Sequence, residues 1–156
     1  MSAVIQAPRL QFRPMQESDL AQVLDTEVQA YQFPWSSNIF QDCLRIGYCS
    51  WVLEQEQFII AYGVMSIAVG ECHILNLCVH PQFQGLGYGQ MMLEHLLELA
   101  RKHKADMAFL EVRPSNGVAR HLYDVNGFDE VGMRRNYYPA HVGREDAVIM
   151  ACSLLP

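Results

Sequence analysis

The chain has 156 residues, of which 51% are hydrophobic and 18% are charged, and its formal net charge is -6. These values predict one globular domain over 1–156, which we expect in the cytoplasm and away from membranes, because no apolar run approaches the roughly 20 residues that span a bilayer and the N-terminus lacks an export-signal pattern. The negative charge argues against direct nucleic-acid binding, which needs a basic face, and is compatible with a basic partner.

The order of predicted elements indicates a mixed sheet covered by helices. Helices are recognised by apolar residues at three- and four-residue spacing, as in Leu20, Val23, Leu24 and Val28, and strands by short β-rich runs between polar turns. In chain order we predict a strand at 10–13, helices at 18–30 and 36–45, strands at 51–54, 58–69 and 72–79, a helix at 87–103, a strand at 107–112, a helix at 115–126, and strands at 129–137 and 147–154. This alternation is typical of the α/β class.

Cysteine and histidine usage predicts no metal site. The five cysteines are odd in number and form no C-x-x-C pair, so we expect reduced thiols that are mostly buried. The six histidines show no ligand spacing with cysteine or carboxylate residues, and we expect them to be surface side chains.

A glycine-rich turn precedes the helix predicted at 87–103, and it is formed by Gln84, Gly85, Leu86, Gly87, Tyr88 and Gly89. Glycines let the backbone curl and present its N–H groups, and a helix start adds partial positive charge, so this turn is a candidate pyrophosphate site. A nucleoside-triphosphate loop is excluded because Gln90 and Met91 stand in place of Lys and Ser or Thr, and the spacing is not that of a dinucleotide fingerprint. An ordinary tight turn is the alternative.

Two residues on neighbouring predicted elements are candidates for proton transfer. Glu111 interrupts an apolar strand, where a carboxylate is costly unless it is paired with Arg113 or another arginine, or serves as a general base with a pKa raised by partial burial. Tyr123, in the following helix, is either a core residue or a proton donor to a departing thiolate, because a phenol has a pKa of roughly 10 and a thiol about 8.5. We expect both side chains to reach one cleft.

Three motifs in combination resemble the GCN5-related N-acetyltransferases (GNAT): Gln84-x-x-Gly87-x-Gly89, Leu110-Glu111-Val112-Arg113-x-Ser115-Asn116 and Leu122-Tyr123-x-x-x-Gly127-Phe128. The resemblance implies a twisted, mixed but mostly antiparallel sheet of about six to seven strands flanked by about four helices. It also implies acetyl-coenzyme A (acetyl-CoA) as cosubstrate, without a metal. The segments 33–36 and 134–139 are similar to the branch of this family that acetylates the N-terminal alanine of small-subunit ribosomal protein eighteen. That branch implies a basic N-terminal peptide of a ribosomal protein as partner.

The resemblance assigns the cosubstrate site. The backbone of Leu77, Cys78 and Val79 is expected to pair with the pantetheine arm and to polarise the thioester carbonyl. The turn 84–89 would hold the pyrophosphate, and Asn116 would contact the cosubstrate. Family members often carry a basic residue where this chain has Gly85, so more of the phosphate binding is left to backbone amides.

The resemblance also assigns the chemistry and the acceptor channel. Glu111 would be the general base, acting through water, and Tyr123 the general acid in contact with the cosubstrate. The residues expected to line the peptide channel are Phe33, Pro34, Trp35, Tyr137 and Tyr138.

Three alternatives stay open at this point. A GNAT enzyme acting on a lysine side chain or a small-molecule amine is disfavoured by the segments 33–36 and 137–138, which match the peptide-acetylating branch. A non-catalytic acyl-CoA binding module is disfavoured because both Glu111 and Tyr123 are present. Contact with proteins of tRNA modification is a third expectation, because related acetyltransferases occur beside such proteins.

Overall fold

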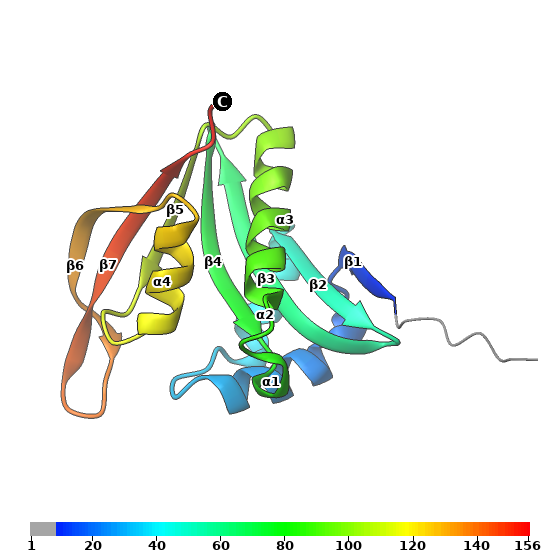
Figure 1. Ribbon diagram of the computed structural model, residues 1–156. Coiled ribbons are helices and arrows are strands. Elements are labelled where there is room, and N and C mark those ends of the chain that lie inside the picture. Colours follow the sequence, from blue (N-terminus) through cyan, green and yellow to red (C-terminus); the bar gives the residue numbers. More distant parts are fainter. Residues whose placement is uncertain (1–8) are drawn as a thin grey trace, which may run out of the picture.

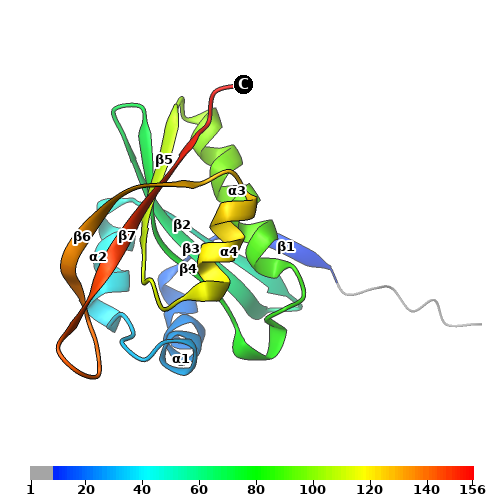
Figure 2. The same cartoon turned by 60° about the vertical axis from the view of Figure 1, so that its left-hand side comes forward.

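The computed structural model describes residues 9–156, which form one seven-stranded sheet with helices on both faces (Figures 1 and 2). The elements are β1 (Leu10–Pro14), η1 (Glu17–Asp19), α1 (Leu20–Ala30), α2 (Ser37–Ile46), β2 (Cys49–Gln55), β3 (Phe58–Ala68), β4 (Glu71–Val79), η2 (Pro81–Phe83), α3 (Tyr88–Lys102), β5 (Met107–Val112), α4 (Gly117–Val125), β6 (Asp129–Pro139) and β7 (Arg144–Ser153). The strand order is β1-β2-β3-β4-β5-β7-β6, and among these described strands only β4 and β5 pair in parallel. The predicted mixed, mostly antiparallel α/β fold is confirmed.

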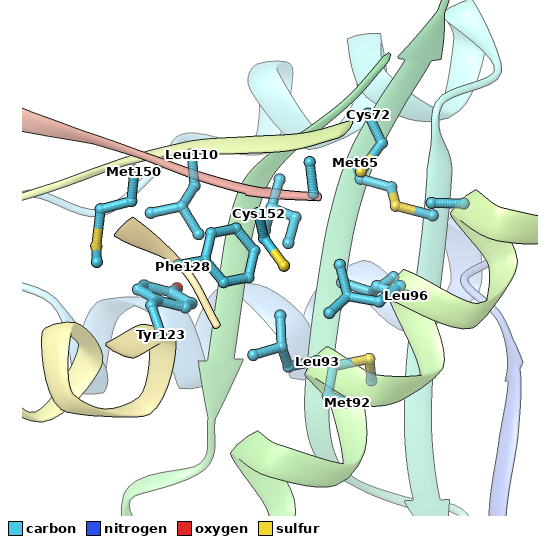
Figure 3. Close-up of a cluster of buried hydrophobic side chains, with 14 of the residues drawn as sticks. Met65, Cys72, Met92, Leu93, Leu96, Leu110, Tyr123, Phe128, Met150 and Cys152 are labelled. Atoms are coloured by element: carbon cyan, nitrogen blue, oxygen red, sulfur yellow. The ribbon is translucent and has the colours of Figure 1, made fainter. Parts of the chain in front are cut away.

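Each face of the sheet carries its own hydrophobic core. Helices α3 and α4 cover one core, in which Leu93, Tyr123 and Phe128 are buried (Figure 3). Helices α1 and α2 cover the other, which includes Val23 and Phe40. The Val28 side chain, which fits the apolar spacing of α1, is 64% exposed, so that part of the predicted stripe is wrong. No helix in the described range 9–156 is both long enough and apolar enough to cross a membrane.

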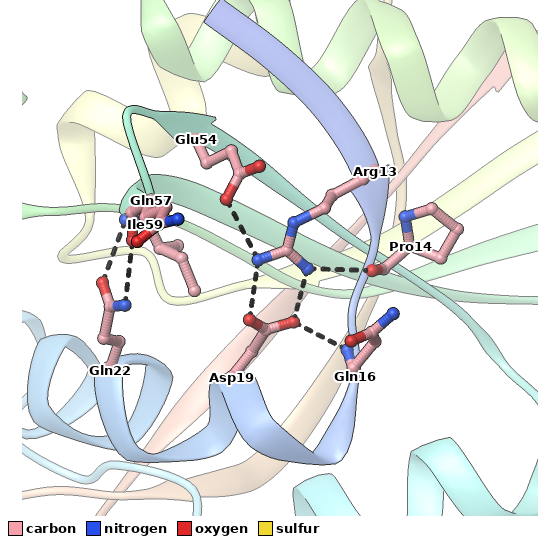
Figure 4. Close-up of polar contacts among 8 residues, drawn as sticks. All are labelled: Arg13, Pro14, Gln16, Asp19, Gln22, Glu54, Gln57 and Ile59. Carbon is pink, nitrogen blue, oxygen red and sulfur yellow. Dashed lines mark hydrogen bonds and ion pairs between the residues drawn. The ribbon is translucent and has the colours of Figure 1, made fainter.

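The start of α1 is fixed to β1 and β2 by an ion-pair cluster (Figure 4). Both guanidinium nitrogens of Arg13 lie 2.7 Å from the two carboxylate oxygens of Asp19, and Arg13 Nη2 also lies 3.1 Å from Glu54 Oε2. Asp19 accepts a further hydrogen bond from the Gln16 N–H over 2.7 Å. The hydrogen bonds from Arg13 lower the pKa of Asp19, because they favour its ionised form.

The strands β4 and β5 separate halfway along their length. They pair only between 71–74 and 107–110, although both strands continue beyond this point. The register with β3 places one extra residue, Leu75, in β4, and a bulge of this kind bends a strand. Beyond the bulge, the main-chain groups along the edge of β4 that faces β5 therefore have no partner in β5.

The alternation of the β3–β4 ladder identifies which residues border this opening. The N–H of His80 donates to the carbonyl of Ile60 over 2.7 Å, which marks a hydrogen-bonded pair of the antiparallel ladder. Because such pairs alternate, Cys78 directs its main-chain groups toward β3, whereas Leu77 and Val79 direct theirs toward the side that β5 has left.

Candidate active site

A cavity of about 920 Å³, called the large cavity below, lies where β4 and β5 separate. Its volume is in the range of small-molecule and cofactor sites. It brings together most of the predicted site residues, namely Phe33, Leu77, Cys78, Val79, Gln84, Gly85, Gly87, Tyr88, Gly89, Asn116 and Tyr123. The predicted residues outside its lining are Pro34, Trp35, Leu86, Glu111, Tyr137 and Tyr138.

The glycine turn forms one end of the large cavity and leads into α3. Gly85 and Gly87 have φ angles of 77° and 90°, in the left-handed region that favours glycine. Gly87 is the N-cap of α3, and no intrahelical acceptor exists for the first N–H groups of a helix. The turn therefore places free N–H donors and the positive end of a fifteen-residue helix beside the cavity.

The free edge of β4 forms the inner wall of the large cavity. The Leu77 carbonyl accepts a hydrogen bond from the Tyr31 hydroxyl over 2.7 Å, and the Val79 carbonyl accepts one from Gln84 Nε2 over 3.2 Å. Burial raises the pKa of the Cys78 thiol to about 11, which keeps it protonated and makes it a poor nucleophile. Tyr31 was not predicted as a site residue, because nothing in the local sequence links it to a strand 46 positions away.

Helix α4 supplies Tyr123 and Asn116 to the large cavity. Tyr123 is 7% exposed, its ring lies 5.7 Å from that of Phe128, and burial raises its pKa to about 12. Asn116 is the N-cap of α4, with its side-chain oxygen accepting from the Ala119 N–H over 3.2 Å. The Asn116 oxygen is thus engaged within the chain.

Glu111 lies in a second, smaller cavity of about 280 Å³, which it lines together with His73 and Arg134. Its carboxylate contacts His73 Nε2 through one oxygen and accepts from Arg134 Nε over 3.2 Å through the other. We expected Glu111 and Tyr123 to line one cleft. This expectation is wrong, because Tyr123 lines the large cavity and Glu111 lines the smaller one. Glu111 also does not pair with Arg113, which contacts Glu145 instead.

The partners of Glu111 reverse the predicted direction of its pKa. The hydrogen bond with His73 lowers the pKa of Glu111 most, the charges of His73 and Arg134 add to this effect, and together they outweigh the opposing effect of burial. The prediction of a pKa raised by burial was wrong because the two basic partners come from strands far along the chain, β4 and β6.

The expectation of surface histidines is also wrong for several rings. Besides His73, His80 is 8% exposed and its Nδ1 accepts from the Gln82 N–H over 3.2 Å. His95 stacks on Phe12 with ring centres 4.1 Å apart. Within residues 9–156, no three His, Cys, Asp or Glu side chains group closely enough to hold a metal ion.

The predicted peptide-channel residues lie in three different environments. Arg113, which lines the large cavity together with Phe33, lies over the rings of both Phe33 and Tyr138. Trp35 instead packs against Phe40 in the core under α1 and α2. Tyr137 is 45% exposed on β6, beside Tyr138.

A buried carboxylate fixes the loop after α1, which carries Phe33 and Trp35. Glu27 is 1% exposed and accepts hydrogen bonds from the Tyr62 hydroxyl over 2.6 Å, from Asn76 Nδ2 over 3.1 Å and from the Trp35 N–H over 2.9 Å. The sequence carried a signal for it, because Glu27 follows the buried Val23 by one helical turn.

The fold and this cavity define the class of protein. Residues 13–128 match the model of the acetyltransferase (GNAT) family, and the chain belongs to this family, so it is an acyltransferase. The [ribosomal protein bS18]-alanine N-acetyltransferase of Escherichia coli K12 is 37% identical over 137 residues, which cover 88% of this chain and 93% of the relative. The corresponding protein of Haemophilus influenzae is 35% identical over 87% of this chain and 93% of its own length.

Solved structures share the fold of this chain. The crystal structure of the ribosomal-protein-S18-alanine N-acetyltransferase from Escherichia coli has a TM-score of 0.88 and 34% identity, with 95% of this chain and 96% of that chain covered. Ard1 from Thermoplasma volcanium, at 22% identity, shares the fold with a TM-score of 0.86 over 94% of this chain and 99% of its own.

Proposed function

We propose that this protein is an N-terminal acetyltransferase that moves the acetyl group of acetyl-CoA to the α-amine of an N-terminal alanine, with ribosomal protein bS18 as its substrate. The observation that carries the proposal is that one cavity is lined by the edge of β4 that β5 leaves unpaired, by the glycine turn and by Tyr123. The likeness to bS18-alanine N-acetyltransferases over most of the chain supports the choice of acceptor.

The residues of the large cavity fit acetyl-CoA. The N–H groups of the turn 84–89 and of the first turn of α3 would bind the pyrophosphate, without needing a basic residue at position 85. The main chain of Leu77 and Val79 would pair with the pantetheine arm along the free strand edge. When bound, acetyl-CoA supplies a thioester carbonyl that an uncharged amine can attack.

The acceptor amine must lose a proton before it can attack, because an α-ammonium group has a pKa of about 7.7–8.0. Glu111 would take part as the carboxylate of the general base, held ionised and oriented by His73 and Arg134. A carboxylate with a lowered pKa does not keep the proton, so we expect a water molecule to carry the proton from the amine past Glu111 to solvent.

Tyr123 would face the sulfur of the leaving group. With a pKa near 12, its hydroxyl stays protonated at neutral pH and can donate a hydrogen bond. Complete transfer to a thiolate is harder for such a phenol than for one of ordinary pKa, since the thiol pKa is about 8.5. The hydroxyl would therefore stabilise the developing negative charge first and release its proton late.

The test is acetyl transfer followed by intact-mass measurement on two peptides. One has the N-terminal sequence of bS18 and begins with alanine, while the other is identical but blocked at its N-terminus and carries an internal lysine. We expect one acetyl group on the first peptide and none on the second. Acetylation of the blocked peptide would move the acceptor to a lysine side chain, and transfer to neither would contradict the proposed substrate.

A further inference from the structure

Tyr31 provides a second phenol in the large cavity, and it comes from a different part of the chain than Tyr123. It follows directly after α1, whereas Tyr123 belongs to α4, and both side chains line the cavity together with Leu77. The Tyr31 hydroxyl donates to the Leu77 carbonyl over 2.7 Å. Leu77 is one of the two residues whose main-chain groups border the opening between β4 and β5, so the Tyr31 hydroxyl lies beside the strand edge along which, in the proposed function, the thioester would bind.

The hydrogen bond to Leu77 fixes what Tyr31 can offer to a ligand. A phenol has one proton to donate, and its oxygen can also accept. Because the proton is engaged with a main-chain carbonyl, a ligand meets the oxygen as an acceptor. Burial raises the pKa of Tyr31 well above its ordinary value, so the proton stays in place at neutral pH.

An uncharged α-amine is complementary to this arrangement. It has N–H groups to donate and one lone pair with which to attack. An N–H held by a fixed acceptor restricts the direction of the lone pair, and restricting a nucleophile in this way is a large source of rate enhancement in enzymes. Thioester and carbonyl groups carry no N–H or O–H, so the Tyr31 oxygen has nothing to accept from the acetyl group itself.

We propose that Tyr31 positions the acceptor: its oxygen accepts a hydrogen bond from an N–H of the substrate α-amine while its own proton remains on the Leu77 carbonyl. The two phenols of the large cavity then have opposite parts, with Tyr31 as acceptor toward the amine and Tyr123 as donor toward the leaving group. This inference rests on the proposed function, and it adds a residue that binds and orients the substrate α-amine.

The test compares Tyr31→Phe with the wild type in three assays: transfer to the alanine-terminated peptide, the KM for acetyl-CoA, and the slow hydrolysis of acetyl-CoA without peptide. Loss of one hydrogen bond to the amine should lower kcat/KM for the peptide by about 10-fold. The KM for acetyl-CoA and the hydrolysis rate should stay within about 3-fold, because neither involves the amine.

Tyr62→Phe is the matched control. Tyr62→Phe also removes one buried phenol hydroxyl, which donates to Glu27, and Tyr62 belongs to the core that Tyr31 packs against but does not line the large cavity. Because Glu27 keeps its hydrogen bonds from the Trp35 N–H and Asn76 Nδ2, we expect Tyr62→Phe to lower the melting temperature with less than about 3-fold loss in kcat/KM. If Tyr31→Phe does not fold, Tyr31→His takes its place, because its ring N–H can still donate to the Leu77 carbonyl but that nitrogen cannot accept from the amine; melting curves are recorded for each variant.

Three possible results distinguish the role of Tyr31 from the proposed function. Peptide kinetics of Tyr31→Phe equal to those of the wild type would overturn the role of Tyr31 while leaving the proposed function intact. Equal losses in peptide transfer and in hydrolysis would also overturn it, since Tyr31 would then act only by shaping β4. A wild-type protein that transfers no acetyl group to the peptide would contradict the proposed function, and the inference with it.

Discussion

The guanidinium carbon of Arg113 lies 4.3 Å from the centre of the Tyr138 ring, the distance of a cation–π contact. The same carbon lies 5.1 Å from the centre of the Phe33 ring. Arg113 also donates to the Pro139 carbonyl over 2.7 Å and contacts Glu145. One side chain at the end of β5 thus joins the loop after α1 to the β6–β7 hairpin, the two segments that we expect to flank the acceptor peptide.

Replacing this planar cation should weaken peptide recognition. Arg113→Lys keeps the charge but loses the flat face that stacks on both rings, which costs about 1–2 kcal/mol, or about 5- to 30-fold in kcat/KM for the peptide. The affinity for acetyl-CoA should change less, as measured by calorimetry. The matched control is Arg120→Lys on α4, where the arginine pairs with Glu130 on the protein surface. Equal losses for peptide and acetyl-CoA would contradict this role of Arg113.

Glu111 should matter for turnover without setting the pH dependence. Its pKa is lowered, so the carboxylate is already ionised well below neutral pH. We expect Glu111→Gln to lower kcat by about 100-fold or more between pH 6 and 9. The acid limb of kcat/KM should persist, because it reports the substrate amine, with a pKa of about 7.7–8.0. An acid limb that disappears in Glu111→Gln would assign that titration to Glu111 instead.

The limits of sequence reasoning are visible at the same residue. The glycine turn and α3 were predictable because their signals are local in the sequence: three glycines at every second position and apolar residues at helical spacing. The partners of Glu111 were not, since His73 and Arg134 lie 38 and 23 positions away and meet it only through strand register. A lone histidine in a β-rich run gives no sign of which carboxylate it will face.

Exposure was the second point that local pattern could not decide. Val28, Val118 and Val125 stand at helical spacing but are 64%, 86% and 60% exposed. Conversely, Glu27 is buried because three donors from β3, β4 and the following loop converge on it. Which side of a helix is buried depends on tertiary packing against other elements, and the sequence of the helix alone does not specify those elements.

Tyr123→Phe should separate chemistry from binding. The ring still packs against Phe128, so the fold and the affinity for acetyl-CoA should stay within about 3-fold of wild type, while the loss of the donor hydroxyl lowers kcat by about 100-fold or more. Single-turnover kinetics with equilibrium binding of acetyl-CoA would measure both. Unchanged turnover would remove Tyr123 from the mechanism and leave it as a core residue.

Gly87→Ala should weaken acetyl-CoA binding more than it weakens the fold. At a φ of 90° any side chain adds backbone strain of about 1–2 kcal/mol, and an added Cβ meets no atom of residues 9–156 within 4 Å. Gly47, with a φ of 89° and an equally open Cβ position at the end of α2, is the matched control. Both variants should lose similar stability in denaturant titrations, but only Gly87→Ala should lose acetyl-CoA affinity, by about 10-fold or more. Retained affinity would mean that the pyrophosphate binds elsewhere.

His95→Phe should stabilise the protein and flatten its response to acid. In the described part of the chain, His95 Nε2 is buried without a hydrogen-bond partner, while the ring stacks on Phe12. A phenylalanine keeps the stack and removes the unpaired nitrogen, for a gain of about 1 kcal/mol, or about 2–4 °C in melting temperature.

The pH dependence has a definite sign. Burial, with a smaller effect from Lys102, lowers the pKa of His95 below its usual 6.5, so the folded protein favours the neutral ring. As the pH falls through 6.5, the unfolded chain binds the proton more readily, and the wild type loses stability. Melting curves from pH 7.5 to 5 should therefore diverge, with His95→Phe retaining more of its stability. The exposed His121, replaced by Gln, is the control that should follow the wild type, and parallel curves for His95→Phe would refute the assignment to His95.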